Sequence, residues 1–190
     1  MADKMLIVHG YSDGSTSFTA LADWFIQQGL YKKKDIWFVD YSSMDDEATF
    51  RDFADKLNDD YKKMCPDYEP IDVACHSTGA LITRGWLALH WYRNHKHGMT
   101  RKCPVRHLLM FAPANFGSDL ASMGQSFLGR ARSTFFNSHS HDEDFLESGK
   151  QVLQGLEPAS PFQWELSHYD LHGEQGAYFN PNNKEEHRCY

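Results

Sequence analysis

The order of apolar segments most constrains what this chain can fold into. Short runs rich in β-branched and aromatic residues alternate with longer stretches in which apolar residues recur at helical spacing. This alternation is typical of a parallel sheet, because parallel strands are joined by crossovers long enough to hold a helix. We therefore expect an α/β fold with a parallel sheet between two layers of helices, three layers in all.

The expected elements succeed one another along the first two thirds of the chain. Strands are expected at residues 5–9, 36–39, 72–75 and 105–112, and helices at residues 18–29, 50–65 and 80–95, the second capped by Thr49 and ended by Pro66. Residues 115–137 hold glycine, phenylalanine and small residues without a clear period, and residues 142–156 are expected to form one more helix. We interpret residues 1–190 as one domain, with a core at 5–114, a cap or lid at 115–170, and a tail or the start of further strands at 171–190.

Composition limits the classes of function. The 190 residues are 41% hydrophobic, which excludes intrinsic disorder, and their net charge of −7 argues against a nucleic-acid partner, since such an interface needs a clustered basic face. No apolar run approaches the roughly 20 residues that span a bilayer, and the first residues do not resemble a signal peptide, so a cytoplasmic location is expected. The cysteines lack CxxC spacing and are expected to be free thiols; they are Cys65, Cys75, Cys103 and Cys189.

One pentapeptide carries a pattern of catalytic chemistry. Residues 75–79 (CHSTG) lie between an expected strand and an expected helix, where the G-x-S-x-G nucleophile elbow belongs, with Cys75 in place of the first glycine. The pattern predicts that Ser77 is a nucleophile on a strained turn. The backbone N–H of Thr78, at a helix N-terminus, and that of Tyr11, after Gly10, are the candidate oxyanion donors.

Three segments in order resemble one superfamily. They are His9-Gly10 after the first strand, the His76–Gly79 elbow, and residues 112–118 (APANFGS) after the fourth strand. Together they resemble the α/β-hydrolase superfamily, in particular lipase-like serine esterases and the GPI-inositol-deacylase-like families. The last segment is similar to Thr-Pro-His-x-Gly-Ser, with Ala112 for Thr and Asn115 for His. The resemblance spans residues 5–118 and implies cleavage of a carboxylic ester through an acyl-enzyme on Ser77, without a cofactor or a metal.

The base and acid of a triad are harder to locate. In the families that this chain resembles, they follow two further strands, and the sequence after His172 leaves room for neither. The resemblance therefore favours a chain that lacks the usual C-terminal segments or is a piece of a longer protein. Within the chain, His168 and His172 are candidates for the base and Asp119 for the acid, since they follow Ser77 in the order this fold uses.

Several residues have simpler interpretations beside the chemical ones. Ser77 can cap the third helix, His9 can orient its own loop, and His76 can be structural or line a substrate site. Cys75 is a poor nucleophile, because it lies on a buried strand where a thiolate is disfavoured. A polar segment resembles a metal cluster in composition, but a solvated loop explains it better; its residues are His139, His141, Asp142 and Asp144.

The expected partner is a small-molecule or lipid ester. Aromatic and Met residues of the cap can line an apolar acyl site or pack the cap on the core; they are Phe116, Met123, Phe127, Phe135 and Phe136. Two other functions stay open: a non-catalytic binding module that keeps the hydrolase core, and an acyltransferase that uses the same elbow. The sequence does not indicate the oligomeric state.

Overall fold

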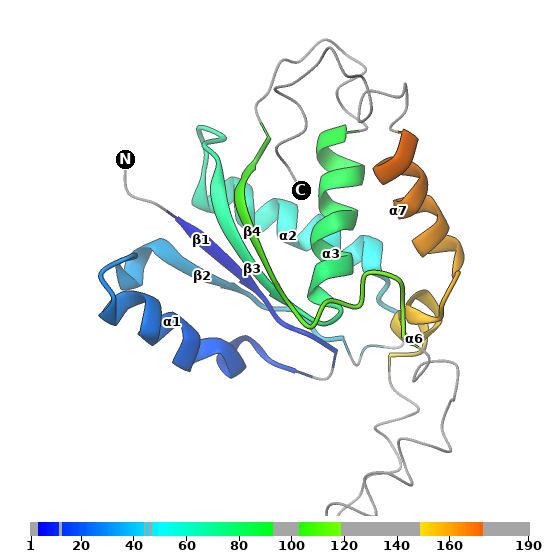
Figure 1. The fold of residues 1–190 in the computed structure, drawn as a ribbon, viewed down its shortest axis with the longest axis horizontal. Helices are drawn as coiled ribbons and strands as arrows, with labels where there is room; N and C mark the ends of the chain where they lie inside the picture. Colours follow the sequence, from blue (N-terminus) through cyan, green and yellow to red (C-terminus); the bar gives the residue numbers. More distant parts are fainter. Residues whose placement is uncertain are drawn as a thin grey trace, which may run out of the picture.

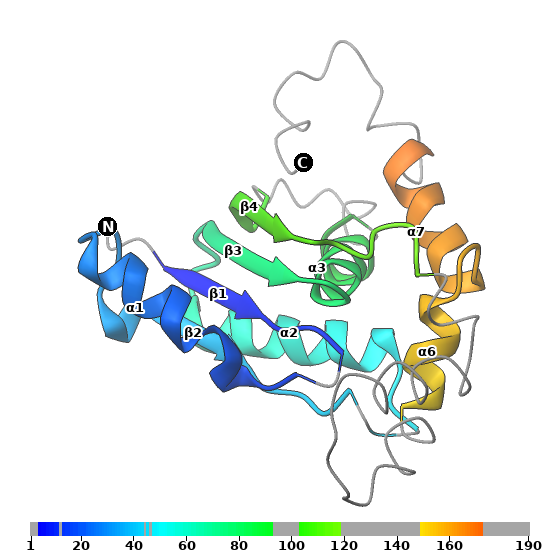
Figure 2. The same ribbon diagram turned by 60° about the horizontal axis from the view of Figure 1, so that its bottom comes forward.

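The computed structural model describes residues 4–11, 13–43, 45, 47–92, 103–118 and 149–172. In this part of the chain a parallel sheet runs in the order β2-β1-β3-β4. Its strands are β1 (Met5–Val8), β2 (Ile36–Val39), β3 (Ile71–His76) and β4 (Val105–Phe111). Figure 2 shows the arrows of β1, β3 and β4 pointing toward the end of the sheet where α6 lies. Because β2 is parallel to β1, the loops that follow all these strands meet at one edge.

Helices cover both faces of the sheet (Figure 1). On one face lies α1 (Thr19–Gln27), flanked by the short helices η1 (Ser15–Phe18) and η2 (Lys33–Asp35). On the other face lie α2 (Phe50–Met64) and α3 (Gly79–Trp86), which continues as the π-helix η3 (Leu87–Tyr92). Two further helices, α6 (Lys150–Leu156) and α7 (Pro161–His172), pack against α2 and η3 respectively. The three-layer α/β fold expected from the sequence is thus confirmed.

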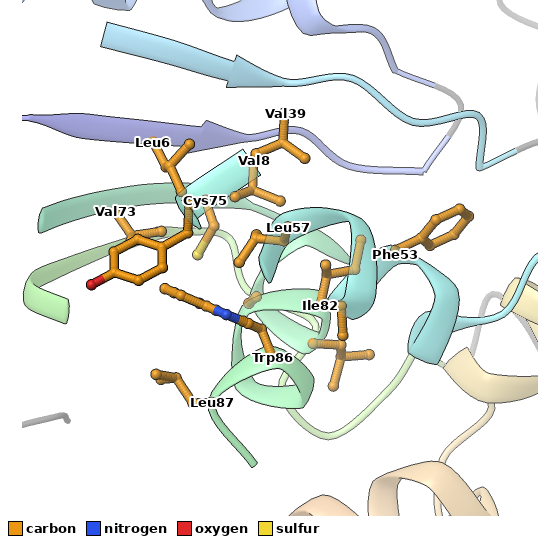
Figure 3. Packing of buried hydrophobic residues seen from close by; sticks show 14 of the residues in the cluster. Leu6, Val8, Val39, Phe53, Leu57, Val73, Cys75, Ile82, Trp86 and Leu87 are labelled. Atoms are coloured by element: carbon orange, nitrogen blue, oxygen red, sulfur yellow. The ribbon is translucent and has the colours of Figure 1, made fainter. Parts of the chain in front are cut away.

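The alternation of side chains along each strand separates two cores. Val73 and Cys75 of β3 join the larger core under α2 and α3, where Leu57 and Trp86 are fully buried (Figure 3). Ala74, between them in sequence, packs instead in the smaller core beneath α1. Successive residues of a strand point to opposite faces, so strands buried on both faces read as continuous apolar runs.

Within residues 5–114, the observed ends of the strands and helices agree closely with the expected ones. The second strand, Ile36–Val39, matches to the residue, and Thr49 caps α2 through a capping box with Asp52. The third strand is longer than expected by one residue at each end, and the third helix changes to π geometry at Leu87. The cap helix is described only from Lys150 onward, and the tail after His172 lies outside the described residues.

Two features differ from the expectations. Helix α7 is absent from the expected elements, because its apolar residues do not follow a helical period.

The expectation of free thiols is wrong for Cys103, which is disulfide-bonded, whereas Cys65 and Cys75 are free and buried. Reducing compartments seldom preserve disulfides, so this bond does not support the expected cytoplasmic location. Among the described helices none is both long and apolar enough to cross a membrane.

A buried carboxylate joins the strands at the amino edge of the sheet. Asp72 of β3 is 3% exposed and accepts hydrogen bonds from Arg106 (Nη2 to Oδ2, 2.7 Å) and from the hydroxyl of Tyr31, while His107 Nδ1 lies 2.8 Å from its Oδ1. Burial alone would raise the pKa of Asp72, but these hydrogen bonds outweigh burial and lower it. The ionised carboxylate therefore stabilises the fold.

We predict that Asp72→Asn lowers the free energy of unfolding at pH 7 by about 1–3 kcal/mol, because charge-assisted hydrogen bonds are lost. Since the folded-state pKa lies below the unfolded value near 3.9, the stabilisation is present above about pH 4 and is lost as the pH falls through the folded-state value. Urea unfolding of both proteins between pH 3 and pH 7 measures this. A difference that stays constant down to pH 3, or an equal loss in Asp59→Asn at an exposed site of α2, contradicts the assignment.

The first turn of α3 crosses the end of β1 at very short range. A Cβ atom added at Gly79 would lie 2.6 Å from the carbonyl oxygens of both Val8 and His9. Both contacts are backbone atoms of a strand end, which cannot rotate away as a flexible side chain can. Only glycine allows the helix to start this close to the sheet.

We predict that Gly79→Ala lowers the free energy of unfolding by about 1–3 kcal/mol through overpacking. Replacing glycine by alanine in a helix usually raises the free energy of unfolding by about 0.4–1 kcal/mol. The cost of the steric clash must therefore exceed this gain. Gly14→Ala is the matched control, because nothing lies within 4 Å of its added Cβ, and we expect a change within about 0.5 kcal/mol. Denaturant unfolding measures both, and equal stability of the two variants would show that the close approach is unimportant.

Candidate active site

The carboxyl edge of the sheet brings distant parts of the chain together. Val8 pairs in register with Val39 on one side and with Cys75 on the other, and His76 pairs with Phe111. The residues that follow these strands therefore meet at one edge. In open parallel sheets this edge is where ligands bind, because the strand-to-helix loops form a crevice there.

Ser77 has a left-handed backbone on the turn between β3 and α3. Its φ of +51° is unusual for a residue with a Cβ atom and costs on the order of 1–3 kcal/mol. Thr78 then returns to the right-handed region and α3 begins at Gly79. A strand, a strained turn at the serine and a helix thus follow one another here.

Hydrogen bonds to the end of β4 and to the loop after it hold this strained turn. The Ser77 N–H donates to the carbonyl oxygen of Phe111 at 3.0 Å, and the Ser77 carbonyl oxygen accepts from the N–H of Ala114 at 3.1 Å. Ala112, between these two partners, also has a positive φ, of 43°. The buried guanidinium of Arg84 fixes the same loop by donating to the carbonyl oxygen of Asn115 at 2.6 Å. The strain at Ser77 is therefore supported from the neighbouring strand.

The loop after β1 approaches the same serine from the other side. A Cβ added at Gly10 would lie 3.1 Å from Ser77 Cβ and 3.1 Å from His76 Nδ1. A larger residue at this position would push the loop away from the turn. Gly10 thus allows the backbone of residues 10–11 to lie against the serine.

A cavity of about 370 Å³ opens at this point. Its walls come from the loop after β1, the serine turn, the loop after β4 and helix α6. The lining residues are Tyr11, Ser77, Thr78, Ala112, Pro113, Ala114, Gly117, Ser118, Leu153 and Leu156. The described part of this lining contains the serine but no imidazole and no carboxylate.

Helix α6 is fastened to the core beside this cavity. The Ser118 N–H donates to the carbonyl oxygen of Leu156 at 2.9 Å. The buried side chain of Gln163 donates to the carbonyl oxygens of Gly155 and Glu157, at 3.3 and 3.1 Å. Gly117 has a φ of +88°, and a Cβ there would collide with the Gln163 amide. The apolar wall formed by Leu153 and Leu156 is therefore a fixed part of the fold.

The two residues before Ser77, Cys75 and His76, lie in different surroundings from the serine. Burial raises the pKa of the Cys75 thiol to about 12, and a hydrogen bond with Thr83 only partly offsets this, so a thiolate nucleophile is disfavoured, as the sequence indicated. The centroid of the His76 ring lies 5.6 Å from that of Phe18, which packs against the smaller core, whereas Cys75 belongs to the larger core on the other face of the sheet.

The structure brings together some of the expected site residues and leaves others undescribed. Ser77, Thr78 and Tyr11 line one cavity. Asp119 and the cap residues from Met123 to Phe136 lie outside the described residues, as does the segment with His139 and Asp144. His168 and His172 are placed on the backbone of α7, whose side chains from residue 168 onward are not described.

The apolar wall of the cavity was not identified from the sequence. Phe116, expected to line an acyl site, is 82% exposed and is absent from the cavity lining. Leu153 and Leu156 occupy that wall instead, and their i, i+3 spacing on the expected cap helix is the signal that could have found them. Among the described side chains, no group of three His, Cys, Asp or Glu residues is arranged to hold a metal ion.

Comparisons with known proteins bear on the fold. No protein-family model matches the chain, and no curated protein does either. Among solved structures, phospholipase PlaB from Legionella pneumophila superposes with a TM-score of 0.72 at 32% identity, over 90% of this chain and 36% of that one. PlaB in complex with thio-NAD gives a TM-score of 0.70 at 30% identity, over 90% and 34% of the two chains.

A more distant structure has the same architecture. The mature form of lipase BlEst2 from Bacillus licheniformis gives a TM-score of 0.59 at 15% identity, over 91% of this chain and 60% of that one. The chain spans about a third of the length of the PlaB chains that it matches. The parallel sheet, the strained serine turn and these neighbours agree: the chain has the α/β-hydrolase fold in the form shared by lipases and esterases.

Proposed function

We propose that this chain carries the nucleophile of a serine hydrolase that cleaves carboxylic esters. The observation that carries the proposal is the left-handed Ser77, at the end of a central strand and in the wall of a cavity. In the proposed reaction Ser77 Oγ attacks the ester carbonyl carbon, the alcohol leaves, and water then hydrolyses the acyl-enzyme. The strained turn keeps the hydroxyl at the carboxyl edge of the sheet, where a substrate can reach it.

Two backbone amides are suited to stabilise the oxyanion of this reaction. The N–H of Thr78 precedes the first turn of α3, where the helix dipole favours negative charge. The N–H of Tyr11 is the second donor, since Gly10 lies against Ser77 and Tyr11 lines the same cavity. Each donor of this kind contributes about 3 kcal/mol to lowering the barrier.

The base and the acid are proposed from chain order. Asp119 follows β4, and His168 and His172 follow it on α7, which gives the order serine, acid, histidine that this fold uses. Helix α7 begins beside the cavity, where Gln163 meets Gly117, and extends alongside α3 toward η3 (Figure 1). Of the two histidines, His168 comes first along this helix, so it is the first candidate for the base.

Lipid esters are the substrate class that the cavity favours. Leu153 and Leu156 present an apolar wall in the same cavity as Ser77, which suits the hydrocarbon chain of an acyl group. The likeness to phospholipase PlaB makes a glycerophospholipid the first substrate to test. Because the chain covers only 36% of that protein, the activity of the whole is part of the proposal.

We predict that a fluorophosphonate probe labels the intact protein on Ser77 and that Ser77→Ala abolishes labelling. The reason is that the probe reacts with an activated serine and forms an adduct that needs the oxyanion donors. Peptide mass spectrometry identifies the labelled residue. Cys75→Ala is the control, because the buried thiol is not reactive, and it should label as the wild type does.

A non-catalytic binding module is the second candidate. It is favoured by one observation: the described lining of the cavity offers neither a base nor an acid beside Ser77. Equal labelling of wild type and Ser77→Ala, or no labelling of the folded protein, would support this candidate and contradict the hydrolase.

A further inference from the structure

The loop after β1 contains a buried histidine that the proposed chemistry does not use directly. His9 is 1% exposed, and its Nδ1 lies 2.9 Å from the carbonyl oxygen of the next residue, Gly10. Its other ring nitrogen, Nε2, is buried and has no hydrogen-bond partner among the described residues. In the tautomer with hydrogen on Nδ1, the ring donates to the Gly10 carbonyl oxygen, which is its one polar contact within the described part of the chain.

This contact fixes the direction of one particular amide. The carbonyl of Gly10 and the N–H of Tyr11 belong to the same peptide group, and in a trans peptide they point in opposite directions. A hydrogen bond that holds the Gly10 oxygen therefore also sets where the Tyr11 N–H points. Tyr11 lines the cavity that contains Ser77, and Gly10 lies against that serine.

Tyr41 holds the histidine in turn. Its ring stacks on the His9 ring, with centroids 3.9 Å apart and planes 11° from parallel, and its hydroxyl donates to the His9 carbonyl oxygen. The other side of the tyrosine packs on Phe53 of α2, at a centroid distance of 4.7 Å. Burial raises the pKa of Tyr41 far above its usual value near 10, so the hydroxyl remains a donor.

From these contacts we propose that His9 and Tyr41 are a positioning pair that aims the Tyr11 N–H at the oxyanion. The proposal rests on the proposed function and deepens it. Neither side chain touches the reacting atoms: His9 acts through the Gly10–Tyr11 peptide, and Tyr41 acts through His9. Their effect is on the transition state, because the negative charge that the amide stabilises develops only there.

The test compares variants that keep or remove the hydrogen-bond donor of residue 9, with p-nitrophenyl butyrate as substrate and the intact protein. His9→Phe keeps a ring to stack on Tyr41 but cannot donate to Gly10. His9→Asn places an amide nitrogen close to where Nδ1 lies and retains the donor. We expect His9→Phe to lower kcat by about tenfold to a hundredfold with KM within about twofold, and His9→Asn to recover most of the loss.

Tyr41→Phe provides a second test that removes only one hydroxyl. We expect kcat to fall by about threefold to tenfold with KM unchanged, since the His9 carbonyl loses its partner but the stacked ring remains. Tyr31→Phe is the matched control: it removes the hydroxyl that donates to Asp72 at the opposite edge of the sheet. This control should lower stability and leave kcat unchanged. Rates are normalised to the sites that a fluorophosphonate labels at completion.

Each outcome has a definite meaning. Wild-type kcat in both His9→Phe and Tyr41→Phe overturns the positioning role while the hydrolase proposal stands. An equal loss in His9→Asn and His9→Phe also overturns it, because the donor then does not matter. If the wild type neither hydrolyses the ester nor labels at Ser77, the proposed function fails, and the positioning role fails with it.

Discussion

The backbone conformation of Ser77 is the constraint on which the site depends. A serine does not adopt a left-handed φ by its own preference, and here its N–H is hydrogen-bonded to the last residue of β4 and its carbonyl oxygen to the loop that follows. Gly79 allows α3 to start against the end of β1, and Gly10 allows the neighbouring loop to reach the serine. Loss of either hydrogen bond, or a larger side chain in place of Gly79 or Gly10, would change where the serine hydroxyl lies.

The cavity beside this serine is assembled from segments far apart in sequence. Loops after β1, β3 and β4 meet because their strands are parallel and in register, and α6 closes the space with two leucines. Buried polar groups keep these pieces in place: Arg84 under the β4 loop and Gln163 between that loop and α6. Surroundings held by hydrogen bonds in this way are what the proposed reaction at Ser77 requires.

The sequence predicted the core well because its strands are short apolar runs and its turns carry specific residues. Ile36–Val39, the Thr49 cap and the strained turn at Ser77 follow from local patterns. Helix α7 lacks an apolar period, so only Ser160, Pro161 and Gln163 at its start signal it, as a capping sequence. The i, i+3 spacing of Leu153 and Leu156 indicates an apolar helix face, but it does not say that this face lines the cavity beside Ser77. The disulfide at Cys103 depends on a tertiary contact, which local spacing does not encode either.

The central claim is that an ester reacts with the hydroxyl of Ser77 to form a covalent intermediate. Intact-protein mass spectrometry after acid quenching during turnover of a p-nitrophenyl ester tests this most directly. We expect a mass increase equal to the acyl group, located by peptide fragmentation on Ser77. Turnover without an adduct under conditions where deacylation is slow, or an adduct on a different residue, would contradict the account.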